Sequence, residues 1–343
     1  MNILMVGPGS DEKGGIATVI ANFKQFYQFS NHHVFFLSSW SERAAKRTSI
    51  YAFFQLRRII REKQIDIVHF HVAQKGSFFR KALLAKIVPK QCQVIFHMHA
   101  SQFDLFYEKS HSIVQRMIRK TLNDVNQLVV LGDNWANFYR SITTTPISII
   151  QNAVSIPEKS LFNLKSKKIV TFGRIGQRKG SYDLLEIAKN IQNFFPDVQF
   201  VLYGDGEVEK IAEKIEEEGI QNVCLGGWIN KVTQQEVLKD TILHFLPSYH
   251  EGLPMAILES MAAGIPNLTT NVGGILEAVH HEKNGMVANP GSINEMTQMI
   301  QQFLEDEARQ LTYSHQARKT IETQFSMNHY LTQWYQFYNR ISK

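Results

Sequence analysis

Short apolar runs alternate with longer segments of helical periodicity along the whole chain, and this alternation limits the possible folds. Segments such as 182–193 and 208–218 have the length and spacing of helices. Strands that alternate with helices form parallel sheets with helices on both faces. The predicted strands are 3–6, 65–70, 94–98, 128–131, 147–150, 169–172, 199–203, 223–225, 242–246, 267–269 and 286–288.

The length of 343 residues exceeds what one ordinary core contains. Two series of strands predict an α/β protein with two doubly wound domains that face each other across a cleft. The polar, lysine-rich segment 157–168 is the predicted linker. We expect an N-terminal domain over 1–156, with 326–343 added to it, and a C-terminal domain over 157–325. The tail is rich in aromatic residues, which predicts a terminal helix that packs on another element.

Leader, membrane and redox signals are weak in this sequence. The first residues lack a basic leader, so a signal peptide is not expected. No stretch approaches the roughly 20 apolar residues of a membrane span. Cys92 and Cys224 lie in different halves and indicate neither a disulfide framework nor a metal ribbon. These features predict a cytoplasmic location.

Basic residues are concentrated in the first half of the chain. Residues 1–150 contain 19 lysines and arginines against 9 acidic residues, whereas the remainder contains 18 against 22. Basic side chains beside aromatic ones can indicate contact with an anionic membrane; a solvated basic helix face is the alternative. No nucleic-acid motif accompanies the charge, so nucleic acid is not an expected partner. The two segments concerned contain Tyr51, Phe53, Phe54, Arg57, Arg58, Arg61 and Lys63, and Phe78, Phe79, Arg80, Lys81, Lys86 and Lys90.

A glycine-rich loop, residues 7–16, follows the first predicted strand. It departs from the dinucleotide-binding fingerprint because Glu12 stands where the third glycine belongs. A nicotinamide cofactor is therefore disfavoured. Gly14 and Gly15 precede an apolar helix and would let backbone approach a ligand closely; a flexible turn is the alternative.

Two predicted strands of the first domain carry paired histidines. His69 and His71 end one strand, and His97 and His99 end another. Residues two apart share a face of a strand, so four imidazoles invite a metal hypothesis. No carboxylate or cysteine is placed to complete such a site, and no metal is predicted. His99, which small residues follow, is the best candidate to face the cleft; a structural histidine is the alternative.

The loop 172–180 follows the first strand of the second domain. Its glycines open a turn, and Arg174 and Lys179 supply fixed positive charge for a diphosphate. A solvated basic turn is the alternative. The next strand is followed by Gly204, and a metal role for Asp205 and Glu207 is a weaker interpretation.

The run 248–266 is typical of a loop with one carboxylate and a short helix with a second. Glu251 precedes the helix, and Glu259 lies about a turn and a half into it. Pro254 is predicted at the first helical position and Gly264 just past the end. The helix N-terminus offers free N–H groups and partial positive charge. Such a helix end can bind an anion, and the carboxylates nearby can accept hydrogen bonds from hydroxyl groups. A sugar nucleotide, which has both a diphosphate and hydroxyl groups, fits this arrangement.

Taken together, these motifs resemble those of the retaining glycosyltransferases of family 4, which have the GT-B architecture. Glu251 and Glu259 resemble that family's pair of glutamates, and the loop at Arg174 and Lys179 resembles its diphosphate-binding loop. The resemblance covers nearly the whole chain. Weaker matches are Gly14 and Gly15, His99 with Ala100 after it where the family often has Gly, and Gln151-Asn152-Ala153 where the family has Asn-Gly.

The resemblance implies transfer of a hexose from a UDP- or GDP-sugar, with retention, to a saccharide or lipid-linked saccharide in polysaccharide synthesis. It implies no metal and no cofactor, action at the inner membrane face, and a C-terminal helix that returns to the first domain. The implied catalytic residues are Glu251, His99, Arg174 and Lys179. The implied nucleotide-sugar-binding residues are Arg174, Lys179, Glu251, Gly252, Leu253, Pro254, Met255, Glu259 and Gly204, with Gly14 and Gly15 in an acceptor or phosphate loop.

Two other kinds of function fit the same architecture: another sugar-converting enzyme, or a protein without catalytic activity. A sugar-nucleotide epimerase would convert its donor without an acceptor, and a phosphorylase is usually much longer. A non-catalytic nucleotide-sugar-binding subunit would be expected to lack one of the two cations or two carboxylates of the second domain, yet all four are present.

Overall fold

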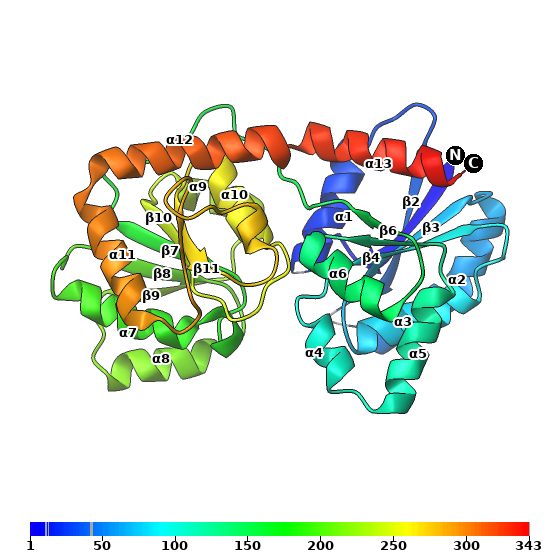
Figure 1. Cartoon of the computed structure of the whole chain (residues 1–343), viewed down its shortest axis with the longest axis horizontal. Helices are drawn as coiled ribbons and strands as arrows, with labels where there is room; N and C mark the ends of the chain where they lie inside the picture. The colour runs from blue at the N-terminus through cyan, green and yellow to red at the C-terminus, as the bar shows by residue number, and fades with distance from the viewer. Residues whose placement is uncertain (11, 13, 42–43, 343) are drawn as a thin grey trace. The chain divides into compact units, whose positions relative to one another are not determined.

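The computed structural model describes residues 1–10, 12, 14–41 and 44–342. These residues form two compact units (Figure 1). Unit 1 contains Met1–Asn152 and Asn328–Lys343, and unit 2 contains Ala153–Met327. The boundaries expected from the sequence, after 156 and after 325, lie within a few residues of these. Asp11 and Lys13 of the first glycine-rich loop lie outside the described residues.

Unit 1 contains a six-stranded parallel sheet in the order β2-β1-β3-β4-β5-β6. The chain moves from β1 to β2 and then restarts on the other side of β1, so the strand order reverses between β1 and β3. Loops at the carboxyl ends beside such a reversal bind ligands in doubly wound sheets. The strands are β1 (Asn2–Pro8), β2 (His33–Trp40), β3 (Ile67–Val72), β4 (Gln93–Met98), β5 (Gln127–Val130) and β6 (Ile147–Ile149).

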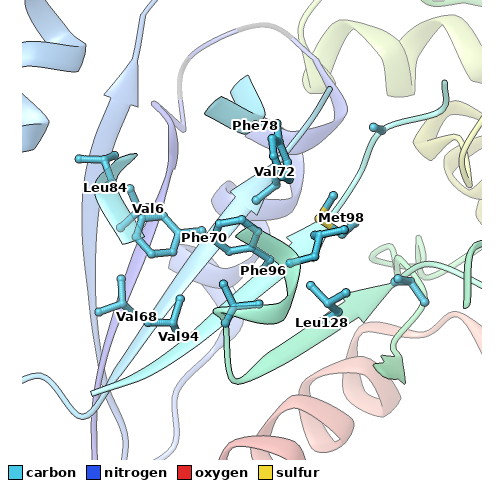
Figure 2. Packing of buried hydrophobic residues seen from close by; sticks show 14 of the residues in the cluster. Val6, Val68, Phe70, Val72, Phe78, Leu84, Val94, Phe96, Met98 and Leu128 are labelled. Atoms are coloured by element: carbon cyan, nitrogen blue, oxygen red, sulfur yellow. The ribbon is translucent and has the colours of Figure 1, made fainter. Parts of the chain in front are cut away.

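Alternation along β3 and β4 separates an apolar face of the sheet from a histidine-bearing face. Val68, Phe70 and Phe96 point into a core that Figure 2 shows from close by. Helices α2, α3, α5 and α6 contribute to the same core. The helices of unit 1 are α1 (Gly15–Phe26), α2 (Ala45–Glu62), α3 (Gly76–Lys86), α4 (Phe103–Glu108), α5 (Ser112–Asn123), α6 (Asp133–Ile142) and α13 (Met327–Ile341).

The opposite face of this sheet is covered by α1 and by the aromatic helix α13. The Trp334 side chain is fully buried, and its ring stacks on His69 with 4.7 Å between centroids. Phe23 of α1 packs edge-on against Trp334 at 5.5 Å. Tyr338 is fully buried and its hydroxyl lies 2.7 Å from Nδ1 of His69. The C-terminal helix therefore completes unit 1, as its aromatic composition predicts.

Unit 2 contains a second six-stranded parallel sheet, in the order β12-β11-β10-β7-β8-β9. Its strand order reverses between β7 and β10. The loops after those two strands are therefore the expected ligand-binding loops of this unit. The strands are β7 (Lys168–Phe172), β8 (Gln199–Tyr203), β9 (Val223–Gly227), β10 (Leu243–Leu246), β11 (Asn267–Thr270) and β12 (Met286–Ala288).

Helices cover the second sheet around an apolar core drawn from its strands and from α7, α8 and α11. None of the helices in the described part of the chain has both the length and the apolar character that a membrane crossing needs. The helices of unit 2 are η1 (Gln177–Lys179), α7 (Ser181–Gln192), α8 (Val208–Glu217), α9 (Lys231–Leu238), α10 (Met255–Ala262), η2 (Ile275–Glu277), α11 (Ile293–Glu305) and α12 (Glu307–Gln324); η1 and η2 are short 3-10 turns.

The structure corrects two expectations about unit 1. Strand β2 was not predicted; it is an edge strand, paired with β1 alone, and most of its residues are partly exposed, so its pattern is neither alternating nor continuously buried. The basic side chains of α3 do not all face solvent. Lys86 is exposed, but Lys81 has only 2% of its surface exposed.

Candidate functional site

The loops after β7 and β10, which flank the strand reversal of unit 2, are joined by a buried ion pair. Lys179 Nζ donates to Glu251 Oε1 at 2.5 Å, and the two side chains are 11% and 6% exposed. The Ser248 hydroxyl donates to the same carboxylate oxygen at 2.7 Å. The two predicted residues therefore meet where a ligand of this sheet is expected, and Glu251 is held by two donors.

Arg178 is a second cation of this cluster, and its role was not predicted. Its guanidinium donates to the His250 carbonyl at 2.9 Å and lies 3.8 Å from Glu251 Oε2. Arg174, in contrast, is exposed and is not part of the Glu251 cluster among the described residues. The loop contains three cations in the sequence. Their position relative to the turn η1 decides which of them approach Glu251.

Glycines allow the loops to approach one another. Gly180 has φ +69°, and a Cβ there would lie 2.0 Å from the Pro247 carbonyl oxygen. Gly204 packs against the β7 loop so closely that a Cβ would lie 1.8 Å from the Gly173 carbonyl oxygen. The two glycines therefore determine how closely the loops after neighbouring strands pack. The contribution of Gly204 comes from this close backbone packing.

The loop after β11 supports the Glu251 segment from a third strand. Gly273 has φ +58°, and a Cβ there would lie 1.8 Å from the Glu251 carbonyl oxygen. The Gly274 N–H donates to the Gly252 carbonyl at 2.6 Å. The glycine pair therefore lets the loop after β11 approach the backbone of the segment that carries Glu251.

Helix α10 follows that loop, with a start one residue later than predicted. Pro254 is the N-cap, with extended backbone (φ −73°, ψ 126°), and Met255 is the first helical residue. Leu253 and Met255 are buried, which fixes the entry of the helix. Gly264 follows the last turn with φ +80°, as predicted, and its N–H donates to the Met261 carbonyl at 2.9 Å.

Glu259 lies on α10, apart from the Lys179–Glu251 pair. Its carboxylate accepts a hydrogen bond from the Gln234 amide of α9 at 3.0 Å. Burial raises the pKa of Glu259, while the Gln234 hydrogen bond and the Lys231 charge act in the opposite direction. Glu259, Lys231 and Gln234 line a small cavity together with Val154, Ser155, Pro157, Leu161, Gln235, Leu238 and Ala263.

The two residues considered for a metal role after β8, Asp205 and Glu207, both contact neighbouring parts of unit 2. The Tyr182 hydroxyl donates to Glu207 at 2.9 Å, and Lys210 lies 3.6 Å from the same carboxylate. The backbone of Asp205 joins the β7 loop, because its carbonyl accepts from the Ile175 N–H at 2.6 Å. These contacts occupy the Glu207 carboxylate and brace the loop of Arg174 through the Asp205 backbone.

In unit 1, the four histidines share one face of the sheet. His69 Nε2 lies 3.2 Å from His97 Nδ1, and His71 Nδ1 lies 3.0 Å from His99 Nε2. Nitrogens of His69, His71 and His97 lie within 4.8 Å of one another, which is a possible metal-binding group. Both His69 nitrogens have partners, however, because Nδ1 lies 2.7 Å from the Tyr338 hydroxyl and Nε2 lies 3.2 Å from His97 Nδ1.

His99 and the first glycine loop both lie at the carboxyl edge of the unit 1 sheet. His99 is partly exposed, and burial, followed by the charge of Lys81, lowers its pKa to about 3. Gly14 has φ +108° at the start of α1, with open space where its Cβ would be. Gly15 is exposed beside it.

Two protein families match most of the chain between them. Residues 13–157 match the family described as Glycosyltransferase Family 4. Residues 154–320 match the family described as Glycosyl transferases group 1. The two matches correspond closely to units 1 and 2.

Known relatives carry transferase names. A 2-deoxystreptamine N-acetyl-D-glucosaminyltransferase of Niallia circulans is 27% identical over 258 residues, which is 68% of this chain and 66% of that protein. A UDP-Gal:alpha-D-GlcNAc-diphosphoundecaprenol alpha-1,3-galactosyltransferase of Escherichia coli is 26% identical over 273 residues, which is 73% of this chain and 69% of that protein. The aligned part thus spans about two thirds of each relative's length.

A solved structure shows the same fold. Sucrose-phosphate synthase from Thermosynechococcus elongatus superposes with a TM-score of 0.83 at 18% identity, covering 99% of this chain and 98% of that one. Both units of the present chain have the Rossmann-like topology on which the GT-B fold is built. With the family matches to both of its units, the chain belongs to the family 4 glycosyltransferases, and it has the GT-B fold.

Proposed function

We propose that this protein transfers a hexose from a UDP- or GDP-sugar to a saccharide or lipid-linked saccharide, with retention of the anomeric configuration, in cell-surface polysaccharide synthesis. The Lys179–Glu251 pair is the observation that carries the proposal. It holds a cation and a carboxylate, both nearly buried, at the strand reversal where the sheet of unit 2 is expected to bind its ligand. Family membership supports the reaction class.

In this proposal the β7 loop receives the diphosphate of the donor. Lys179 is fixed by Glu251, whereas Arg174 is exposed and free to reach a ligand. Two cations and the N-terminus of α10 would stabilise the negative charge that develops on the leaving diphosphate. Because these groups supply the positive charge, we propose a reaction without a metal ion or other cofactor.

The two glutamates would then have different tasks. Glu251 is rigidly held beside Lys179 and would contact the donor sugar. Glu259 accepts a hydrogen bond from Gln234 and would accept further ones from ribose hydroxyls. Gly252, Leu253 and Met255 would line the donor sugar through their backbone.

Substitution of the glutamates by glutamine tests this division. We expect Glu259→Gln to weaken UDP binding about tenfold, because one charge-assisted acceptor is lost. We expect Glu251→Gln to leave UDP affinity nearly unchanged and to lower turnover about a hundredfold. Thermal-shift screening of UDP- and GDP-sugars would identify the donor, calorimetry would give affinity, and release of nucleoside diphosphate would give turnover.

The control is Glu236→Ala on α9, whose 64% exposed side chain pairs with Lys239 at the surface. Unchanged affinity in the Glu259 variant, together with unchanged turnover in the Glu251 variant, would refute the assignment. Conversion of the donor to an epimer without acceptor would instead indicate an epimerase.

Helix α2 supports contact of unit 1 with an anionic membrane surface. Tyr51 and Phe54 are 58% and 71% exposed, and Ile50 and Phe53 are also exposed. Arg57, Arg58 and Arg61 follow within the same helix and are exposed as well. Exposed aromatic rings followed by cations suit the interface of a bilayer with anionic lipids. We therefore propose peripheral membrane contact through α2, which would place the enzyme beside lipid-linked acceptors.

Replacing Tyr51 and Phe54 together with serine is expected to lower vesicle binding at least tenfold, because two interfacial anchors are lost. Sedimentation with phosphatidylglycerol-containing vesicles measures this, and phosphatidylcholine vesicles show the requirement for anionic lipid. Phe194→Ser provides the control, since that ring is 67% exposed but lies in unit 2. Equal binding of the wild type to both vesicle types contradicts the proposal.

A further inference from the structure

Lys81 of α3 is a buried ammonium without a counter-ion. Only 2% of its surface is exposed. Its Nζ donates to the Ser77 hydroxyl at 3.2 Å, and no carboxylate pairs with it in the described part of the chain. Burial, followed by the charge of Arg80, lowers the pKa of Lys81 to about 7. An isolated cation in such a place is costly, so a reason for keeping it is expected.

The groups around Lys81 are donors. The Arg80 Nε is buried and has no partner among the described residues. His71 Nδ1 pairs with His99 at 3.0 Å, but Nε2 of His71 is buried and has no hydrogen-bond partner within the described part of the chain. When His99 donates to His71, Nε2 of His71 carries the proton and is available to an acceptor. Burial is the main cause that lowers the pKa of both histidines and keeps them neutral. The charge of Lys81 is the second cause for His99, and for His71 it follows those of His69 and His99.

This donor cluster lies where the fold of unit 1 is expected to bind ligands. His71 and His99 are at the carboxyl ends of β3 and β4, and β3 borders the strand reversal. Helix α3 begins at Gly76, directly after β3, so its free N–H groups lie at the same edge. Gly76 is exposed and Ser77 partly so, which leaves an approach from solvent.

We propose that Lys81, Ser77 and His71 form an oxyanion subsite in unit 1 that binds a phosphate or diphosphate group of the acceptor. The donor's diphosphate is assigned to unit 2, so a second anion site in unit 1 fits the other substrate. This part of the inference rests on the proposed function. It agrees with the name of the Escherichia coli relative, whose acceptor carries a diphosphate.

Calorimetric titration of the full chain, saturated with UDP to occupy unit 2, tests the subsite with sulfate and pyrophosphate as probes. We expect Lys81→Met to weaken binding of both at least tenfold, with UDP affinity unchanged. We also expect this variant to melt at a higher temperature than the wild type without ligand, because an unpaired buried charge is replaced by an apolar chain of similar shape. A merely structural lysine would give the opposite shift. Lys86→Met, on the exposed last turn of α3, is the matched control.

Sulfate keeps its charge through the neutral range, so its pH profile reports on the protein. Affinity is expected to fall about tenfold per pH unit above about pH 7, as Lys81 loses its proton in the free protein, and the profile of Lys81→Met is expected to be flat. Arg80 stays charged and the two histidines stay neutral over that range. Farnesyl diphosphate, compared with pyrophosphate, distinguishes a lipid-linked from a soluble phosphate group, and either result requires Lys81.

Equal anion binding by the Lys81→Met variant and the wild type, or loss of all anion binding once UDP is saturating, overturns the subsite. UDP titration in the same samples keeps this outcome separate from failure of the proposed function. Normal UDP binding with no second anion site refutes the subsite alone.

Discussion

Replacing Lys179 with methionine is expected to lower turnover by about two to three orders of magnitude and to destabilise unit 2 by about 3–5 kcal/mol. The two effects have different physical origins. The substitution leaves the Glu251 carboxylate, 6% exposed, with the Ser248 hydroxyl and the more distant Arg178 as its remaining donors. It also removes the fixed cation proposed to stabilise the leaving diphosphate. Urea unfolding and nucleoside diphosphate release measure the two effects separately.

Two further variants distinguish these origins. Adding Glu251→Gln to Lys179→Met removes the unpaired charge, so much of the stability is expected to return while turnover stays low. Lys189→Met is the control, because Lys189 pairs with Glu218 at 3.2 Å on the surface and its loss should cost at most about 1 kcal/mol. Full turnover in the single variant would show that the leaving group is stabilised elsewhere.

Gly273→Ala is expected to lower sugar-nucleotide affinity and turnover at least a hundredfold, although residue 273 need not touch substrate. An added methyl group would lie 1.8 Å from the Glu251 carbonyl oxygen, a contact that backbone on both sides must relieve by moving. A misplacement of about 1 Å in a catalytic group can reduce the rate about a hundredfold. Calorimetry with UDP and the turnover assay report the effect.

The matched control is Gly219→Ala at the end of α8. Gly219 has φ +63°, close to the +58° of Gly273, but nothing lies within 4 Å of its added Cβ. Backbone strain alone should therefore cost about 1–2 kcal/mol in stability and leave UDP affinity unchanged. If both variants bound UDP equally, the close approach to Glu251 would not matter for the site.

Most strands were predictable because parallel strands covered on both faces are continuous apolar runs. β3 and β4 are almost entirely buried, and the sequence places both correctly within two residues. β2 was not predicted, because an edge strand in partial contact with solvent has a mixed pattern of apolar and polar residues. The start of α10 was placed one residue early, because Pro254 is as compatible with extended backbone as with a first helical turn.

The site was predictable where a strand end and a charge coincide, as at Lys179 and Glu251. It was not predictable where the choice depends on which way a side chain turns. Arg174 and Arg178 are equivalent in the sequence, yet only Arg178 approaches Glu251. Lys81 was expected among solvated basic residues beside Phe78, and its burial depends on how α3 sits on the sheet.

The membership of α13 in unit 1 has a consequence for synthesis on the ribosome. Unit 2 is one continuous stretch, Ala153–Met327. Unit 1, in contrast, is complete only after Asn328–Lys343 has been translated. Until then His69 on the sheet and Phe23 on α1 lack Trp334, against which both pack. The second unit can thus complete its core before the first, which reverses the N-to-C order in which domains generally fold during translation. A nascent chain arrested before α13 would hold a finished second unit attached to an unfinished first one.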